Sequence, residues 1–282
     1  MHIVNDHREL PGLCPHPPAF VPTMGALHEG HLELVRHAAT GDRPVVVSVY
    51  VNPTQFAAGE DLATYPRTLE DDTERARDAG ADVLFVPDTE VIYPEGVERA
   101  ARAAAELELP AVATEPGLED GCRPHFFGGV CLVVGRLFDL VRPGLAVFGE
   151  KDYQQLRVVS EMVAAERDRF GPLEIVGRPT VRDGRGLALS SRNVGIDPAD
   201  ADRALGLIRA LEEAGNATTP EDAEARIRST LDRHGLETQY AVVRNARTLQ
   251  LVRAQESEPL RALIAARLGS IRLIDNGPLE LA

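Results

Sequence analysis

The sequence is poor in lysine, in cysteine and in long apolar runs. All but one of its 30 basic residues are arginine, the exception being Lys151, and 44 acidic residues bring the formal net charge to −14. Nucleic acids and anionic membranes bind basic surfaces, so this balance argues against both as partners. A small anionic ligand held by a local cluster of positive charge is still compatible with it.

The three cysteines follow no known pattern. Cys14, Cys122 and Cys131 are odd in number and lack the CxxC or Cys/His spacing of a metal site, which predicts a reduced, cytoplasmic protein. The first residues, MHIVNDHREL, lack the apolar core of a signal peptide. The longest apolar stretch, GVCLVVGRLFDLV, is broken by Arg136 and Asp139, so we expect no membrane span.

Apolar runs and helical patterns alternate through the first two-thirds of the 282 residues. We predict helices near 68–80, 98–108, 128–141 and 152–166. The strands are predicted at 19–22, 45–51, 82–87, 145–149 and 173–177. Strands separated by helices predict an α/β fold, a Rossmann-like parallel sheet with helices on both faces.

The last third differs in pattern. We predict helices at 198–213, 219–234 and 257–268 and strands at 238–245 and 270–276. This composition indicates a smaller α+β C-terminal domain. We place the boundary near 178–182, which gives domains of residues 1–180 and 181–282.

The first candidate site is TMGALHEGH (23–31), which follows a predicted strand and opens a helix. Backbone N–H groups and the helix dipole favour an anion there, and Gly25 and Gly30 let the main chain approach a ligand. His28 and His31 share one face of a helical first turn, where both rings could donate to phosphate oxygens. The spacing is neither a Rossmann fingerprint nor a P-loop, and a surface helix start with incidental histidines is the alternative.

Three further segments carry polar groups in comparable places. Asn52 and Gln55 follow the strongest predicted strand, where ligands bind in open α/β sheets, although an Asn-Pro turn is the alternative. Lys151 lies in GEKDYQQ (149–155), and a lone lysine in an arginine-rich chain suggests a need for a compact ammonium rather than chance survival. The loop LSSRN (189–193) could clamp phosphates or be an ordinary polar loop. Together these donors suit a nucleoside triphosphate and a polar co-substrate.

Five segments, PTMGALHEGH, YVNPTQF, YPRT, VFGEKDYQQL and GLALSSRN, resemble the pantothenate synthetase (pantoate–β-alanine ligase) family in order and spacing. That family belongs to the HIGH-motif nucleotidyltransferases, with HEGH as the HIGH signature and LSSR as the KMSKS-like loop. The resemblance implies that ATP and (R)-pantoate, assisted by Mg²⁺, give an enzyme-bound pantoyl adenylate and pyrophosphate. The amine of β-alanine then attacks the acyl carbon and releases pantothenate and AMP. The resemblance also implies a homodimer.

The resemblance assigns expected roles to residues. His28, His31, Lys151 and Arg192 are expected to be catalytic, with His31 at the position usually labelled as the proton donor. The expected ATP-binding residues are Met24, Gly25, Ala26, Leu27, His28, Glu29, Gly30, His31, Gly149, Glu150, Lys151, Asp152, Val181, Leu189, Ser190, Ser191 and Arg192. Pantoate and β-alanine are expected at Gln55, Gln155, Asn52 and Tyr65. Asp71 and Asp72 are the expected Mg²⁺ partners.

One segment departs from the family pattern. Where the family reads close to RPGHFRGV, this chain reads RPHFFGGV (123–130). Phe126 thereby replaces an expected histidine, and Gly128 replaces a residue that is often basic. We expect His125, one position earlier, to compensate in part.

Three rival functions fit less well. Another adenylyl- or cytidylyl-transferase is disfavoured because Gln55 and Gln155 mark the pantoate pocket of the family. A catalytically dead nucleotide-binding regulator is disfavoured by the intact histidines, Lys151 and Arg192. A tRNA-acting enzyme is disfavoured by the charge of −14 and by the lack of an anticodon-binding extension.

Overall fold

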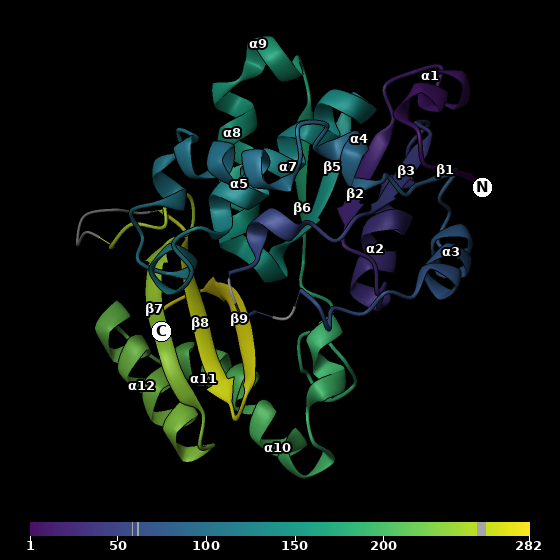
Figure 1. The fold of residues 1–282 in the computed structure, drawn as a ribbon. Helices are drawn as coiled ribbons and strands as arrows, with labels where there is room; N and C mark the ends of the chain where they lie inside the picture. Colours follow the sequence, from purple (N-terminus) through teal and green to yellow (C-terminus); the bar gives the residue numbers. More distant parts are fainter. Residues whose placement is uncertain (58, 61, 253–257) are drawn as a thin grey trace.

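The computed structural model describes residues 1–57, 59–60, 62–252 and 258–282. Figure 1 shows two layered parts, a larger one formed by the first two-thirds of the chain and a smaller one below it. The larger part is built on a six-stranded, all-parallel sheet in the order β1-β4-β3-β2-β5-β6. Its strands are β1 (His2–Val4), β2 (Ala19–Thr23), β3 (Val45–Val49), β4 (Val83–Phe85), β5 (Leu145–Gly149) and β6 (Glu174–Arg178).

Helices cover both faces of this sheet. One face packs against α2 (Glu29–Ala38) and α3 (Leu69–Asp78), and the other against α5 (Val97–Glu106), α7 (Phe126–Val141) and α8 (Tyr153–Ala165). The short helices are α1 (Leu10–Leu13), α4 (Thr89–Ile92), α6 (Glu119–Cys122) and α9 (Arg167–Phe170). The predicted Rossmann-like α/β architecture is confirmed.

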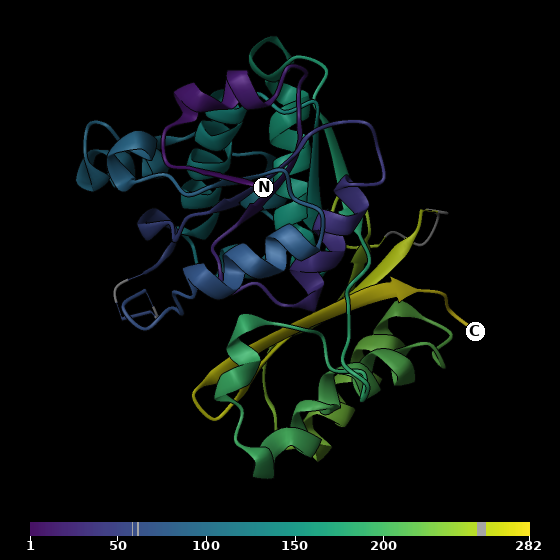
Figure 2. The same cartoon turned by 90° about the vertical axis from the view of Figure 1, so that its right-hand side faces the viewer.

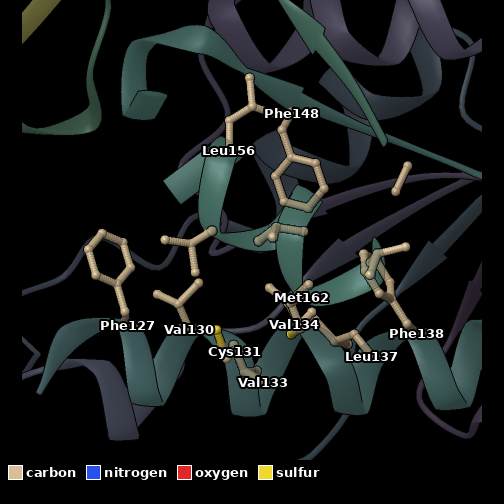
Figure 3. Close-up of a cluster of buried hydrophobic side chains, with 14 of the residues drawn as sticks. Phe127, Val130, Cys131, Val133, Val134, Leu137, Phe138, Phe148, Leu156 and Met162 are labelled. Atoms are coloured by element: carbon tan, nitrogen blue, oxygen red, sulfur yellow. The ribbon is translucent and has the colours of Figure 1, made fainter. Parts of the chain in front are cut away.

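Alternation along the central strands divides the core in two. Phe20 and Val46 point into the cluster that contains α7 and α8, whereas Val21 and Val47 point into the cluster that contains α2 and α3. All four are fully buried, which explains why these strands read as continuous apolar runs. Figure 3 shows part of the first cluster, with the apolar stripe of α7 from Phe127 to Phe138 facing Phe148, Leu156 and Met162.

The smaller part is a three-stranded antiparallel sheet of β7 (Glu237–Asn245), β8 (Leu260–Leu268) and β9 (Ile271–Leu279). Its helices are α10 (Ala201–Ala204), α11 (Gly206–Ala214) and α12 (Pro220–Arg233). Figure 2 shows the yellow strands lying between the larger part and the green helices. This sheet is therefore covered on both faces, one by α11 and α12 and the other by the α/β part.

The predicted helix at 257–268 is wrong for the described residues 258–268, and its residue 257 lies outside them. LRALIAARL has helix-forming residues, but it forms the central strand β8, in which every residue from Arg261 to Ala266 is buried. Burial on both faces of a central strand has outweighed local helix propensity. The predicted helix at 198–213 is also broken, into a 3₁₀ turn (Pro198–Asp200), α10 and α11. The remaining predicted strands and helices are present with small shifts at their ends.

In the part of the chain that the structure describes, no helix is both long and apolar enough to cross a membrane.

Candidate active site

The candidate site lies at the carboxyl ends of β2 and β5. The chain leaves β2 for β3 on one side, and β5 pairs with β2 on the other, so the strand order reverses between β2 and β5. Ligands of open α/β sheets bind at such a reversal. A cavity of about 780 Å³ opens there, and residues of both parts of the molecule line it.

The turn after β2 adopts a conformation that needs a small residue and an outside anchor. Gly25 has φ +82° and Ala26 has φ 50°, so two successive residues are left-handed. The Asp72 carboxylate of α3 accepts from the Ala26 N–H at 3.0 Å and from the Leu27 N–H at 2.7 Å. A buried carboxylate from a distant helix therefore fixes the entry to α2.

The two histidines cap α2 with their own rings. His28 Nδ1 accepts from the Gly30 N–H at 3.1 Å, and His31 Nδ1 accepts from the His28 N–H at 3.3 Å. The rings stack with their centroids 4.0 Å apart. A Cβ on Gly30 would lie 2.9 Å from the His28 ring, so glycine is needed for this arrangement. Because both Nδ1 atoms accept, each neutral ring carries its proton on Nε2 and can donate it to a ligand.

Both imidazoles are neutral near pH 7. Burial, with a smaller contribution from the nearby Lys151 charge, lowers the pKa of His28 to about 4. Burial also lowers the pKa of His31 to about 3, with the His28 and Lys151 charges adding to the effect. The rings are thus suited to donate hydrogen bonds to an anion rather than to carry positive charge.

Lys151 brings a positive charge close to the two histidines. It lies in a 3₁₀ turn (Glu150–Asp152) between β5 and α8, and its side chain is 19% exposed and lines the cavity. Its Nζ is 3.6 Å from the Asp152 carboxylate. The ammonium therefore faces the same space as the two imidazole rings.

The turn after β3 presents Gln55 to the cavity. Asn52 Nδ2 donates to Gln55 Oε1 at 3.0 Å and to the Gly129 carbonyl at 3.2 Å. Asn52 Oδ1 accepts from the Tyr93 hydroxyl at 2.7 Å and from Thr54. Asn52 is 1% exposed, and both atoms of its amide bind within the protein. Its side chain therefore orients Gln55, which lines the cavity.

Two successive glutamines at the start of α8, Gln154 and Gln155, lie beside the cavity. Both border the cavity, but the buried Gln154 amide accepts from the Glu119 N–H and donates to the Val112 carbonyl and the Asp120 carboxylate. Gln155 is thus the member of the pair that is available to a substrate.

The loop LSSRN approaches the cavity from the opposite side. The Leu189 N–H donates to the Val181 carbonyl at 3.0 Å, and the Ser190 side chain caps the following 3₁₀ helix (Ser191–Gly195). Tyr65, which is buried, places its hydroxyl 3.5 Å from Ser191 Oγ. The structure therefore brings this loop to the same cavity as the two strand-end turns.

Most of the residues predicted to bind ATP or substrate meet at this cavity. It is lined by Met24, His28, Gly30, His31, Asn52, Gln55, Tyr65, Gly149, Lys151, Asp152, Gln155, Val181, Leu189, Ser190, Ser191 and Arg192. Gly25, Ala26 and Leu27 shape the turn from behind, and Leu27 is part of the core. Glu29 is exposed and paired with Arg36, and Glu150 is paired with Arg261.

Asp71 and Asp72 do not form a metal site together. Asp72 uses both oxygens on backbone N–H groups, and Asp71 is exposed and paired with Arg75 at 3.1 Å. Within the described ranges, no group of three or more histidine, cysteine, aspartate and glutamate side chains is placed to hold a metal ion. These residues do not fit a resident Mg²⁺.

The segment 123–130, whose sequence differs from the family pattern, packs closely against its neighbours. Phe126 lines the cavity in place of the expected histidine, while His125 is exposed and does not line it. A Cβ on Gly128 would clash with the Ala104 carbonyl oxygen, and one on Gly129 with the Thr54 carbonyl oxygen. A basic side chain at position 128 has no room here, and His125 lies outside the cavity lining.

Sequence reasoning missed a buried group that joins the two parts. Glu119 accepts from the Tyr240 hydroxyl at 2.8 Å and from the Arg272 guanidinium at 2.6 and 2.9 Å. Burial, together with the Glu119 charge, raises the pKa of Tyr240 well above its ordinary value. All three residues line the cavity, but their partners lie more than a hundred residues apart in the sequence and give no local signal.

The chain is similar in sequence to known ligases. The model of the pantoate–β-alanine ligase family matches residues 13–278. Pantothenate synthetase 2 of Bradyrhizobium diazoefficiens is 47% identical over 262 residues, which cover 92% of this chain and 89% of that protein. Pantothenate synthetase of Rhodopseudomonas palustris is 46% identical with the same coverage.

Solved structures show the same similarity. Pantothenate synthetase from Thermus thermophilus superposes with a TM-score of 0.87 at 40% identity, covering 98% of this chain and 99% of that one. Pantoate–β-alanine ligase from Francisella tularensis, complexed with β-γ ATP and β-alanine, gives a TM-score of 0.76 at 32% identity over 99% and 97% of the two chains. Both matches extend over the α/β part and the smaller antiparallel part.

Proposed function

Because the chain belongs to the pantoate–β-alanine ligase family, we infer that its cavity joins pantoate to β-alanine at the expense of ATP, with pantoyl adenylate as the intermediate. ATP-dependent ligation of pantoate and β-alanine is the activity of the family. The adenylate route is supported by the convergence of His28, His31 and Lys151 on one cavity at the strand-order reversal.

In the first step, a carboxylate oxygen of pantoate bonds to the α-phosphorus of ATP. The bond from that phosphorus to the bridging oxygen breaks, and pyrophosphate leaves with the electron pair. Negative charge builds on the phosphoryl oxygens, so fixed donors lower the barrier. The Nε2–H groups of His28 and His31 and the Lys151 ammonium are those donors, and the N-terminus of α2 adds its dipole.

In the second step, the β-alanine nitrogen bonds to the acyl carbon. The bond to the phosphate oxygen breaks, AMP leaves with the electron pair, and the nitrogen loses a proton. Neither step needs a covalent enzyme nucleophile. Because the acyl adenylate is sensitive to water, a closed cavity protects it.

The depressed pKa values define the role of the histidines. At neutral pH His28 and His31 donate hydrogen bonds as neutral rings and do not carry a positive charge. For His31, the residue expected as a proton donor, we therefore propose stabilisation of the departing pyrophosphate by a hydrogen bond.

The substrates other than ATP occupy the rest of the cavity in this proposal. Gln55 and Gln155 bind pantoate, Asn52 orients Gln55, and Tyr65 steadies Ser191. We propose that residues 1–180 form the nucleotide- and pantoate-binding domain and that residues 181–282, the smaller domain, act as a lid. Arg192 and its neighbours in the lid then reach the phosphates.

Mg²⁺ enters this proposal bound to the ATP phosphates. It would neutralise their charge without a contribution from Asp71 or Asp72, because those side chains bind elsewhere in the protein. We also propose a cytoplasmic homodimer. The family supports the dimer, and three free cysteines support a reducing compartment. Sedimentation of the purified protein tests the dimer.

The decisive assay follows AMP formation from ATP. AMP is expected only when both pantoate and β-alanine are present. With ATP and pantoate but without β-alanine, a single turnover of pyrophosphate release is expected. Chelation of Mg²⁺ should abolish both signals. AMP formation at an equal rate without pantoate, or none with both substrates, contradicts the assignment.

A further inference from the structure

The turn that carries Lys151 is held by the other part of the molecule. Asn276 Nδ2, in β9, donates to the carbonyl oxygens of Glu150 at 3.0 Å and of Lys151 at 2.8 Å. Asn276 is 4% exposed, and both protons of its amide are used on the turn. The backbone of the turn after β5 is thus fixed by a single side chain of the antiparallel sheet.

Arg261, in β8, fixes the orientation of that amide. Its Nε donates to Asn276 Oδ1 at 2.7 Å, and its Nη2 donates to the Glu150 carboxylate at 2.7 Å. The guanidinium lies 3.6 Å above the centre of the Tyr153 ring, and the Arg261 side chain is 8% exposed. Because the Asn276 oxygen is bound, the amide cannot rotate its NH₂ away from the turn.

Asp275, the neighbour of Asn276, anchors the segment that leads into Leu189–Arg192. Its carboxylate, 1% exposed, accepts from the Arg182 guanidinium at 2.7 and 2.9 Å. Arg182 forms an antiparallel bridge with Ala188, directly before Leu189. Successive residues of a strand point to opposite sides, so this dipeptide reaches two separate segments.

We propose that Asp275 and Asn276 are positioning residues, which fix the Lys151 ammonium and the segment Leu189–Arg192 relative to each other for adenylate formation. This proposal rests on the proposed function of the cavity. Both residues border the cavity, but their side chains are used on Arg182 and on the turn, so each acts through those partners. Their effect is catalytic because displacement of a preorganised donor by about 1 Å can slow a reaction ~10²-fold.

The variant Asn276→Asp tests the proposal. It keeps an oxygen for Arg261 but sets a second oxygen against the two carbonyl oxygens of the turn. We expect single-turnover pyrophosphate release from ATP and pantoate to slow ~10- to 100-fold, with kcat changing more than the KM for ATP.

The matched control is Asn245→Asp. Asn245 is 5% exposed and lies in the same sheet, but its Oδ1 binds the N–H groups of Arg247 and Thr248 in its own turn. An aspartate keeps that oxygen, so the rate should stay at the wild-type value. A second variant, Arg261→Lys, keeps a charge opposite Glu150 but cannot reach Glu150 and Asn276 at once. It should slow the same half-reaction to a smaller extent and decides the matter if Asn276→Asp does not fold.

A double variant shows whether the effect passes through the lysine. In a Lys151→Ala background, Asn276→Asp should slow the reaction little further, because residues that act as a unit are not additive. Full multiplication of the two effects, or a wild-type rate in folded Asn276→Asp, overturns the proposal. If Asn276→Asp does not fold, a wild-type rate in Arg261→Lys overturns it. If the wild type itself releases no pyrophosphate, the proposed function fails; if it does and Asn276→Asp equals it, only the positioning role fails.

Discussion

The two turns that flank the strand-order reversal are anchored in opposite ways. The turn of residues 24–31 is fixed from within its own part of the molecule, by Asp72 and by the rings of His28 and His31. The turn of residues 150–152 is fixed across the interface, by Asn276 and Arg261. The first is therefore complete in the α/β part alone, whereas the second is complete only when the antiparallel sheet is in place.

The largest expected effect on the rate comes from removing the lysine of the second turn. Lys151→Ala is expected to slow adenylate formation by a factor of order 10²–10³, the range for losing one preorganised donor. Lys151→Arg should rescue poorly, since a planar fork does not replace a compact ammonium. Single-turnover pyrophosphate release measures both, with Arg99→Ala as a control that removes an exposed cation paired with Glu95. Near-wild-type rates in Lys151→Arg would contradict the ammonium argument.

Asp72→Ala should damage the first turn without reaching the second. It leaves the Ala26 and Leu27 N–H groups unpaired, so we expect the free energy of unfolding to fall by on the order of 3 kcal/mol. Adenylate formation should slow ~10-fold or more through misplaced donors. Denaturant unfolding and the half-reaction assay measure the two effects.

Asp71→Ala is the matched control for that variant. Asp71 is exposed and its pair with Arg75 lies at the surface, so we expect a change within about 0.5 kcal/mol. The Mg²⁺ concentration needed for half-maximal rate should not change. A large increase in that concentration would make Asp71 a metal ligand after all.

Gly30→Ala separates activity from stability in the first turn. Its Cβ would push the His28 ring out of place, so adenylate formation should slow ~10-fold. Alanine favours a helix over glycine by about 1 kcal/mol, which offsets the lost His28 cap, so the melting temperature should change little. Gly121→Ala, in α6 with no atom within 4 Å of the added Cβ, should leave the rate unchanged. Equal loss of rate and stability would mean that His28 is only a cap.

The smallest expected effect links the two turns electrostatically. In the free protein, NMR should show His28 and His31 as Nε2–H tautomers that protonate near pH 4 and 3, below the ordinary value of 6.5. Their pKa values are lower in the folded than in the unfolded protein, so protonation of the unfolded chain destabilises the fold at low pH. The contribution of the two neutral rings to the free energy of unfolding is complete above about pH 6.5 and is lost as pH falls through 4 and 3. In Lys151→Ala both pKa values should rise. Titration of either ring near pH 6.5 in the wild type would remove the basis for neutral donors.

The strands of the α/β part could be predicted because a run of apolar residues in the local sequence already indicates that both faces are buried. VVVSV (45–49) is buried on both faces and reads as one apolar run, which only a covered strand requires. β1 was missed because it has three residues at the sheet edge. LRALIAARL was misread as a helix, since nothing in the segment itself reveals that sheet neighbours and helices enclose it.

The site was predicted in the same uneven way. HEGH and GEKD were found because their chemistry is contiguous. The anchors Asp72, Arg261 and Asn276 act on residues 45 to 126 positions away, so spacing alone could not assign them. The sequence does indicate Asp72, but as a Mg²⁺ ligand, whereas both of its carboxylate oxygens accept hydrogen bonds from backbone N–H groups.

The single lysine has a practical consequence. The side chains of this protein offer one primary amine, and it lies in the cavity. An amine-selective acylating reagent would therefore modify one side chain, whose extent of labelling reports the state of the cavity. ATP should protect it, and the mass increment of the peptide that carries Lys151, read apart from that of the N-terminal amine, would serve as an occupancy probe without any engineered tag.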